Sequence, residues 1–150
     1  MRIEQEIKQR KFTSDYQRAI INIMYTSNWF NENFKGVMSR FDITSQQYNV
    51  LRILKGRYPD KCASHEIKEV MLDKSPDLTR LMDRLIEKGF VKREVCEENR
   101  RKMDIVITKK GMNLVDSVSP SLKEFENKFK KKISSKEAVE LSKILDKMRG

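Results

Sequence analysis

The feature that most constrains the fold of this chain is a change in hydrophobic period near its middle. On either side, apolar residues recur every three or four positions, which is the period of amphipathic helices. Two segments, 90–95 and 103–108, are instead β-prone, with Ile105 and Ile107 at alternate positions of the second. The charged stretch between them, 96–102, fits a turn. We therefore predict a mainly α-helical protein with a small β-ribbon.

Four helices are expected before the ribbon. They are a long helix at 12–34, a second at 45–57, a short third from Ser64, and a fourth at 76–88. A capping box of Thr44 and Gln47 opens the second helix. Ser64 and Ser75 are the predicted N-caps of the third and fourth helices, and Gly89 suits the left-handed residue that ends the fourth.

The helical period returns after the ribbon. Pro120 is expected to kink or restart the helix there, because proline lacks an amide hydrogen. A capping box of Ser134 and Glu137 then opens a final helix. The predicted organisation is one domain over 1–150, with a lobe at 43–108 flanked by helices at 12–34 and 109–148.

The third and fourth helices, joined by a short turn, have the order of a helix-turn-helix. In that motif the second helix enters the major groove of DNA. The residues opposite or beside the apolar stripe of helix 76–88 are Pro76, Asp77, Thr79, Arg80, Asp83, Arg84 and Glu87. A mixed-charge face suits base reading, because arginine can bridge guanine O6 and N7. A simple solvated helix face is the alternative that this pattern leaves open.

The charged tip of the ribbon carries Arg100 and Arg101. A hairpin placed directly after a recognition helix forms a wing, and arginine suits a narrow minor groove electrostatically. Lys102 can add a phosphate contact. An ordinary charged hairpin loop is the alternative for the ribbon taken by itself.

Charge and composition favour a polyanionic partner. The chain holds 32 Lys and Arg against 22 Asp and Glu, a formal net charge of +10. The excess is spread along the chain and not gathered in a tail, so a binding surface has to be made by folding. The sequence shows no signal peptide and no apolar run long enough to span a membrane, and we expect a soluble, cytoplasmic protein.

Catalytic and metal chemistry are not expected. His65 is the only histidine, which makes a catalytic triad hard to assemble. Cys62 and Cys96 are too few for a zinc ligand set. No phosphate-binding glycine loop is present either. We predict no enzyme activity, no cofactor and no metal.

Three stretches of the sequence resemble the multiple-antibiotic-resistance regulator (MarR) family. They read SQQYNVLRIL, HEIKEVMLDKSPDLTRLMDRLIEKGFVKRE and NRRKMDIVITKKG, and the resemblance covers roughly 43–112. The most specific parts are TRLMDRLIEKGFVKR at 79–93 and the pair Arg100-Arg101 followed by ITKKG. One departure is Asn99, where the family usually has an aspartate that would hold an arginine of the wing tip by an ion pair.

The resemblance implies a winged helix-turn-helix regulator that binds double-stranded DNA, with repression as the expected action. It implies a homodimer in which the N-terminal and C-terminal helices interlock and hold two lobes over a pseudo-palindromic operator, about 34 to 36 Å apart. The implied base-reading residues are Ser75, Asp77, Thr79, Arg80 and Arg84, the wing residues Arg100, Arg101 and Lys102, and the phosphate-contacting residues Ser64, His65 and Lys74.

The resemblance also implies release from DNA by a small aromatic or anionic effector. Tyr25, Trp29, Phe41 and Tyr48 could line its pocket, although aromatics at helical spacing also serve as core. Redox sensing is not expected, because the family members that use it carry a cysteine near the N-terminal helix. The alternative function is a winged-helix module that docks proteins without sequence-specific DNA binding; arginines at the wing tip and the basic excess argue against it.

Overall fold

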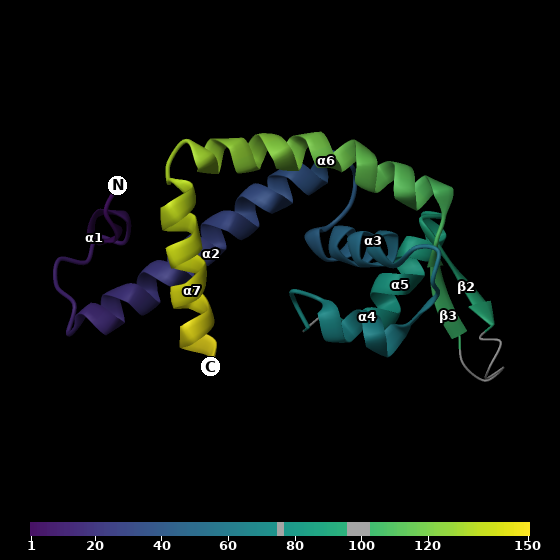
Figure 1. The fold of residues 1–150 in the computed structure, drawn as a ribbon, viewed down its shortest axis with the longest axis horizontal. Coiled ribbons are helices and arrows are strands. Elements are labelled where there is room, and N and C mark those ends of the chain that lie inside the picture. The colour runs from purple at the N-terminus through teal and green to yellow at the C-terminus, as the bar shows by residue number, and fades with distance from the viewer. Residues whose placement is uncertain (75–76, 96–102) are drawn as a thin grey trace. The chain divides into compact units, whose positions relative to one another are not determined.

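The computed structural model describes residues 1–74, 77–95 and 103–150 (Figure 1). Its helices are α1 (Ile3–Glu6), α2 (Asp15–Ser39), α3 (Ser45–Arg57), α4 (Ser64–Val70), α5 (Leu78–Glu87), α6 (Lys109–Lys130) and α7 (Ser135–Arg149), and its strands are β1 (Cys62–Ala63), β2 (Val91–Val95) and β3 (Met103–Ile107). The chain divides into two compact units, Met1–Ser45 and Gln46–Gly150. Each unit is described by itself.

The first unit is built on the long helix α2. Its N-cap is Ser14, whose hydroxyl accepts a hydrogen bond from the Gln17 amide at 3.1 Å. The helix therefore starts later than the predicted 12–34, and it ends later too, since it continues through the buried Met38. The short helix α1 was not predicted, because four residues give too little periodicity to recognise.

The second unit contains the small sheet. The strand order is β1-β3-β2, and both pairings are antiparallel. The predicted ribbon is confirmed as β2 and β3, with Val91 opposite Ile107. The prediction missed β1, whose Cys62 pairs with Ile105. A two-residue strand has no alternation of its own, so only its partner strand defines it.

The core of the second unit lies where α3, α4 and α5 meet the sheet and the first half of α6. Its most deeply buried side chains include Leu51, Leu54, Ile67, Met82, Leu85, Ile105 and Val118. Each helix contributes one apolar face, as the period predicted. The mainly helical winged-helix fold class predicted from the sequence is the one observed.

Two predicted N-caps are wrong. The N-cap of α4 is Ala63, whose amide donates to the Glu66 carboxylate at 2.7 Å, so Ser64 is already helical. The N-cap of α5 is Asp77, so this helix begins at Leu78 and not at residue 76. The predicted cap Ser75 lies outside the described residues.

Two helix boundaries in the C-terminal half follow from local chemistry. The capping box of Ser134 and Glu137 is formed as predicted at the start of α7. Pro120, by contrast, lies inside α6 and does not restart it. A proline removes one intrahelical hydrogen bond, and α6 retains its bonds on both sides of that gap. No helix in the described part of the chain has the length and apolar character needed to cross a membrane.

Candidate nucleic-acid interface

Helix α5 has one buried face and one exposed face. Leu81, Met82 and Leu85 are buried on the first. The opposite face carries Thr79, Arg80 and Arg84, and all three are exposed. The two arginines are four residues apart and therefore neighbours on the helix surface. Neither guanidinium forms an ion pair within the described residues, so both remain available to an external acceptor.

Two acidic side chains of this region, Asp77 and Asp83, have partners within the protein. The Asp77 carboxylate accepts from the Arg80 amide at 3.3 Å and so caps the helix. Asp83 pairs with Arg93 of β2, with 2.6 Å between carboxylate oxygen and guanidinium nitrogen. The first contact fixes the start of α5, and the second ties its exposed face to the sheet. Arg93 was not among the predicted site residues, because only the folded chain brings it to Asp83.

The end of α5 is joined to the start of α6. Gly89 has a φ of 72°, as predicted for the residue that ends the helix. The Lys110 ammonium donates to the Lys88 carbonyl at 2.7 Å, and the Thr108 hydroxyl donates to the Gly89 carbonyl at 2.8 Å. A side chain at Gly111 would collide with the backbone that follows Gly89. Helices α5 and α6 are therefore held as neighbours by close contacts.

The three predicted phosphate contacts lie at the start of α4 and in the turn before α5. Ser64 and His65 are exposed in the first turn of α4, and Lys74 is exposed after its end. Because Ala63 and Glu66 form the cap, the Ser64 hydroxyl is not used for capping. It has no hydrogen-bond partner in the described structure and can donate to an external anion.

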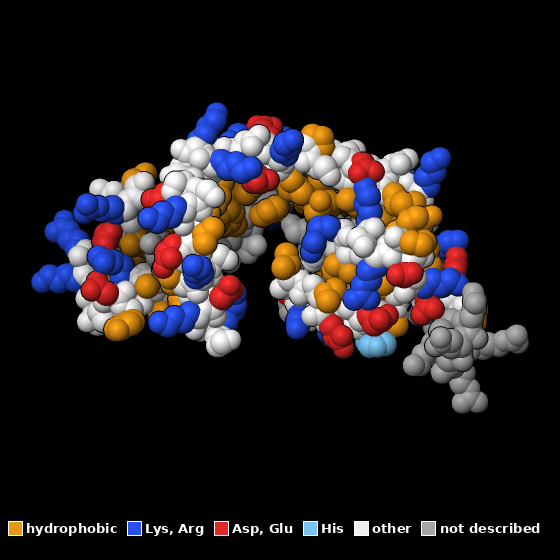
Figure 2. Space-filling model, in the orientation of Figure 1, with side chains coloured by type: hydrophobic (Ala, Val, Ile, Leu, Met, Phe, Trp, Pro, Cys, Tyr) orange, Lys and Arg blue, Asp and Glu red, His pale blue; other side chains and the backbone are white. Residues whose placement is uncertain are grey.

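The basic residues of the sheet are partly neutralised. Lys92 and Lys61 place their ammonium groups 2.6 and 3.1 Å from the two carboxylate oxygens of Glu94. Hydrogen bonds from Lys92 and then from Lys61 lower the pKa of Glu94 below its ordinary value. Figure 2 shows basic and acidic side chains interleaved over the face in view, without one dominant basic patch. Net charge alone therefore does not mark the interface.

The predicted wing residues Arg100, Arg101 and Lys102 lie outside the described residues, as do Ser75, Cys96 and Asn99. Cys62 is fully buried, and the Arg57 guanidinium donates to its sulfur at 3.7 Å. No group of three or more potential ligand residues within 1–74, 77–95 and 103–150 could hold a metal ion.

The four predicted pocket residues are divided between the two units. Tyr25, Trp29 and Phe41 belong to the first and Tyr48 to the second. The Tyr25 hydroxyl donates to the Glu6 carboxylate at 2.8 Å, and this hydrogen bond raises the pKa of Tyr25. Burial raises the pKa of Tyr48, against an opposing effect of the Arg52 guanidinium.

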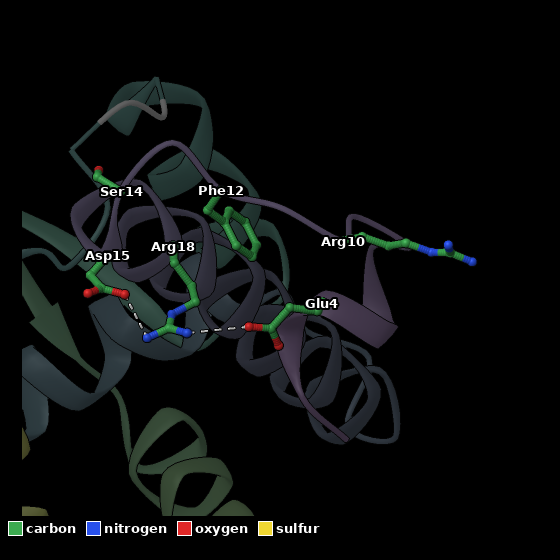
Figure 3. Close-up of a pocket in the computed structure, with 6 residues that line it drawn as sticks. All are labelled: Glu4, Arg10, Phe12, Ser14, Asp15 and Arg18. Carbon is green, nitrogen blue, oxygen red and sulfur yellow. Dashed lines mark ion pairs between the residues drawn. The ribbon is translucent and has the colours of Figure 1, made fainter.

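A polar cavity of about 340 Å³ lies elsewhere in the first unit. Its lining residues are Glu4, Arg10, Phe12, Ser14, Asp15 and Arg18 (Figure 3). None of the four predicted pocket residues contributes to it. The predicted effector pocket stays a prediction.

Comparisons with known proteins agree with the predicted fold. Residues 43–103 match the sequence model of the MarR family. The chain is 25% identical over 113 residues to the HTH-type transcriptional regulator PecS of Dickeya dadantii, which covers 75% of this chain and 68% of PecS. PecS is by its name a transcriptional regulator, the function class that the sequence predicted.

Solved structures show the same fold. A MarR transcription factor from Planctomyces limnophilus is 28% identical, with a TM-score of 0.69 over 91% of this chain and 98% of that one. The MepR-DNA complex of Staphylococcus aureus is 23% identical, with a TM-score of 0.77 over 92% and 97% of the two chains. A MarR-like regulator from Bacillus cereus is 20% identical, with a TM-score of 0.79 over 90% and 96%.

Proposed function

We propose that this chain is a transcriptional regulator of the MarR family, which binds double-stranded DNA in a sequence-specific manner and represses transcription as a homodimer. The observation that carries the proposal is the exposed face of α5. Arg80 and Arg84 project from a helix whose other face is locked into the core, and neither is neutralised within the described residues. The S. aureus relative MepR was solved as a complex with DNA.

In this function α5 lies in the major groove. Arg80 and Arg84 read guanine through O6 and N7, and Thr79 contacts a neighbouring base. Asp77 and Ser75 act at the start of the helix, with Asp77 holding the Arg80 backbone in place. The predicted wing residues Arg100, Arg101 and Lys102 reach the adjacent minor groove.

Phosphate contacts fix the position of the lobe on the duplex. Ser64 donates its uncommitted hydroxyl, His65 donates a ring N–H, and Lys74 adds a positive charge beside the turn. Such contacts carry no sequence information but set the register in which α5 meets the bases.

Unpartnered apolar residues on the flanking helices support the homodimer. On α7, the exposed fractions of Val139, Leu141, Ile144 and Met148 lie between 45 and 54%. In the other unit, α2 exposes Tyr16, Ile20 and Met24. Contiguous apolar surface of this kind marks an interaction site. A two-fold dimer then presents two copies of α5 to a pseudo-palindromic operator, about 34 to 36 Å apart.

We further propose that a small aromatic or anionic effector releases the dimer from its operator. Half-exposed Tyr25 and Trp29, both on α2 of the first unit, offer aromatic surface for such a ligand. Repression follows if operator occupancy excludes the transcription machinery, and effector binding then induces the regulated genes.

The test begins with selection of fragments bound from genomic DNA, followed by titration of the selected duplex at several salt concentrations. Arg80→Ala and Arg84→Ala should each weaken specific binding by about 5- to 150-fold, the loss of one good base contact. Arg149→Ala at the end of α7 removes the same charge far from α5 in the sequence and serves as the matched control.

Two results would overturn the proposal. One is an affinity that does not fall with rising salt, because phosphate contacts release counterions. The other is equal weakening by all three variants, which would indicate attraction by net charge without base reading.

A further inference from the structure

The first twelve residues, which we call the strap, fold back onto α2. The Tyr25 hydroxyl donates to the Glu6 carboxylate at 2.8 Å, across nineteen positions of sequence. Glu4 and Arg18 form a second contact at 3.6 Å. Ile3 is only 7% exposed, although it is the third residue of the chain. Two polar contacts therefore hold the strap to α2, and one of its side chains is buried.

The strap covers one particular face of α2. Arg18, Ile21 and Tyr25 lie along it, because residues three, four and seven positions apart share a helix face. Ile21 is half-buried, whereas the adjacent Ile20 and Met24 are 53 and 62% exposed. The strap therefore lies along the side of α2 that carries Arg18 and Tyr25 and leaves Ile20 and Met24 exposed.

The ion pair that joins the strap to Arg18 is a weak attachment. Arg18 is shared, since Asp15 lies closer to it at 2.9 Å than Glu4 does. Figure 3 shows Arg18 between the two carboxylates, with Arg10 pointing away. The cavity of about 340 Å³ lies where the strap meets the first turn of α2. Helix α1 has four residues, too few to be stable by itself.

We propose that the strap is a latch that opens and closes as a unit over the Arg18, Ile21 and Tyr25 face of α2, with the Glu6–Tyr25 hydrogen bond as its catch. A segment held by two exposed polar contacts and one buried side chain opens locally without unfolding the rest. While it is closed, the Tyr25 hydroxyl is occupied by the chain's own carboxylate and is unavailable to any ligand. When it opens, the hydroxyl and Ile21 become accessible together. This proposal does not rest on DNA binding.

The catch is tested by Tyr25→Phe, which removes one oxygen and keeps the ring. Two readouts follow strap opening: deuterium exchange of the amides of residues 3–9, and trypsin cleavage after Lys8, Arg10 and Lys11. Both track the open population when opening is fast. Tyr25→Phe should raise both by about two- to ten-fold, the effect of one lost hydrogen bond. Tyr16→Phe, which alters a tyrosine 83% exposed on the same helix, is the matched control and should change neither.

A second variant separates the catch from a general loss of stability. Glu6→Ala should open the strap as much as Tyr25→Phe, and the double variant should open it no further, because both remove the same bond. Exchange of the α3 amides should stay at the level of the unaltered protein. The proposal is overturned if Tyr25→Phe behaves like Tyr16→Phe, if the two losses add in the double variant, or if α3 exchange rises in parallel.

Discussion

Replacing Asn49 by leucine should stabilise this protein. Asn49 lies in α3, is 7% exposed, and is flanked by the fully buried Val50 and Leu51. Both polar atoms of its side chain are buried and have no hydrogen-bond partner among the described residues. Folding therefore removes these atoms from water without replacing the hydrogen bonds that water gave them.

The size of the effect follows from that loss. An unsatisfied buried polar group costs about 1–3 kcal/mol, and leucine has a higher helix propensity than asparagine by a few tenths of a kcal/mol. Leucine differs in shape at the branch point, so packing offsets part of the gain. We expect Asn49→Leu to raise the free energy of unfolding by about 2 kcal/mol, which corresponds to about 4–8 °C in Tm for a chain of this size.

Thermal and urea unfolding followed by circular dichroism, at one fixed protein concentration, measure this change. The urea midpoint should rise with an unchanged m-value. Asn113→Leu is the matched control, since Asn113 is exposed on α6 and reports helix propensity alone. If Asn49→Leu instead lowers Tm, the amide has a partner, such as a buried water, and the reasoning from its unsatisfied atoms is refuted.

Three further changes test other parts of the structure. Gly111→Ala should lower the free energy of unfolding by about 1–3 kcal/mol, because the added Cβ meets backbone atoms. Gly56→Ala, which has open space around it in α3, should be neutral or stabilising, and equal Tm values for the two variants would contradict this. Ile144→Glu should lower the sedimentation coefficient toward that of the monomer, whereas Lys143→Glu should not change it. An unchanged dimer in Ile144→Glu would show that α7 is not part of the interface. The pKa of Glu94 is lower in the folded protein, so its ionised form stabilises the fold above its unfolded pKa, and this effect is lost as the pH falls through the folded pKa. In Glu94→Gln the free energy of unfolding should therefore fall less steeply over that pH range. An unaltered pH profile would count against the lysine contacts.

The features that sequence alone could predict are those specified by nearby residues. The apolar stripe of α5, the positive φ at Gly89 and the capping box at Ser134 all depend on residues within a few positions of one another. Local steric and hydrogen-bonding preferences are then enough to decide the structure. The ribbon was predictable for the same reason, since β2 and β3 each carry a β-prone composition.

The predictions that were wrong or incomplete concern features decided by competing cap residues or by contacts distant in the sequence. At α4 the N-cap is Ala63, one residue before the predicted Ser64, and the Glu66 carboxylate accepts a hydrogen bond from the Ala63 amide. At α5, Asp77 lies two residues beyond the predicted cap and its carboxylate binds the amide three residues on. Strand β1 exists only because β3 offers a free edge, so two residues suffice there. No local pattern indicates which of several acceptable caps or edges the folded chain will use.

The candidate interface depends most on contacts of this second kind. Residue types predicted which face of α5 is polar, but Asp83 on Arg93 of β2 and Lys110 on the carbonyl of Lys88 also help to position the helix. The first contact joins α5 to β2, and the second joins it to α6, which is 22 residues long. If α6 and α7 form the proposed dimer, these two contacts transmit its geometry to both arginines of α5. Asp83→Asn, which keeps the size of the side chain but not its charge, should therefore weaken DNA binding without changing the dimer. Equal affinity would show that α5 is held by its apolar face alone.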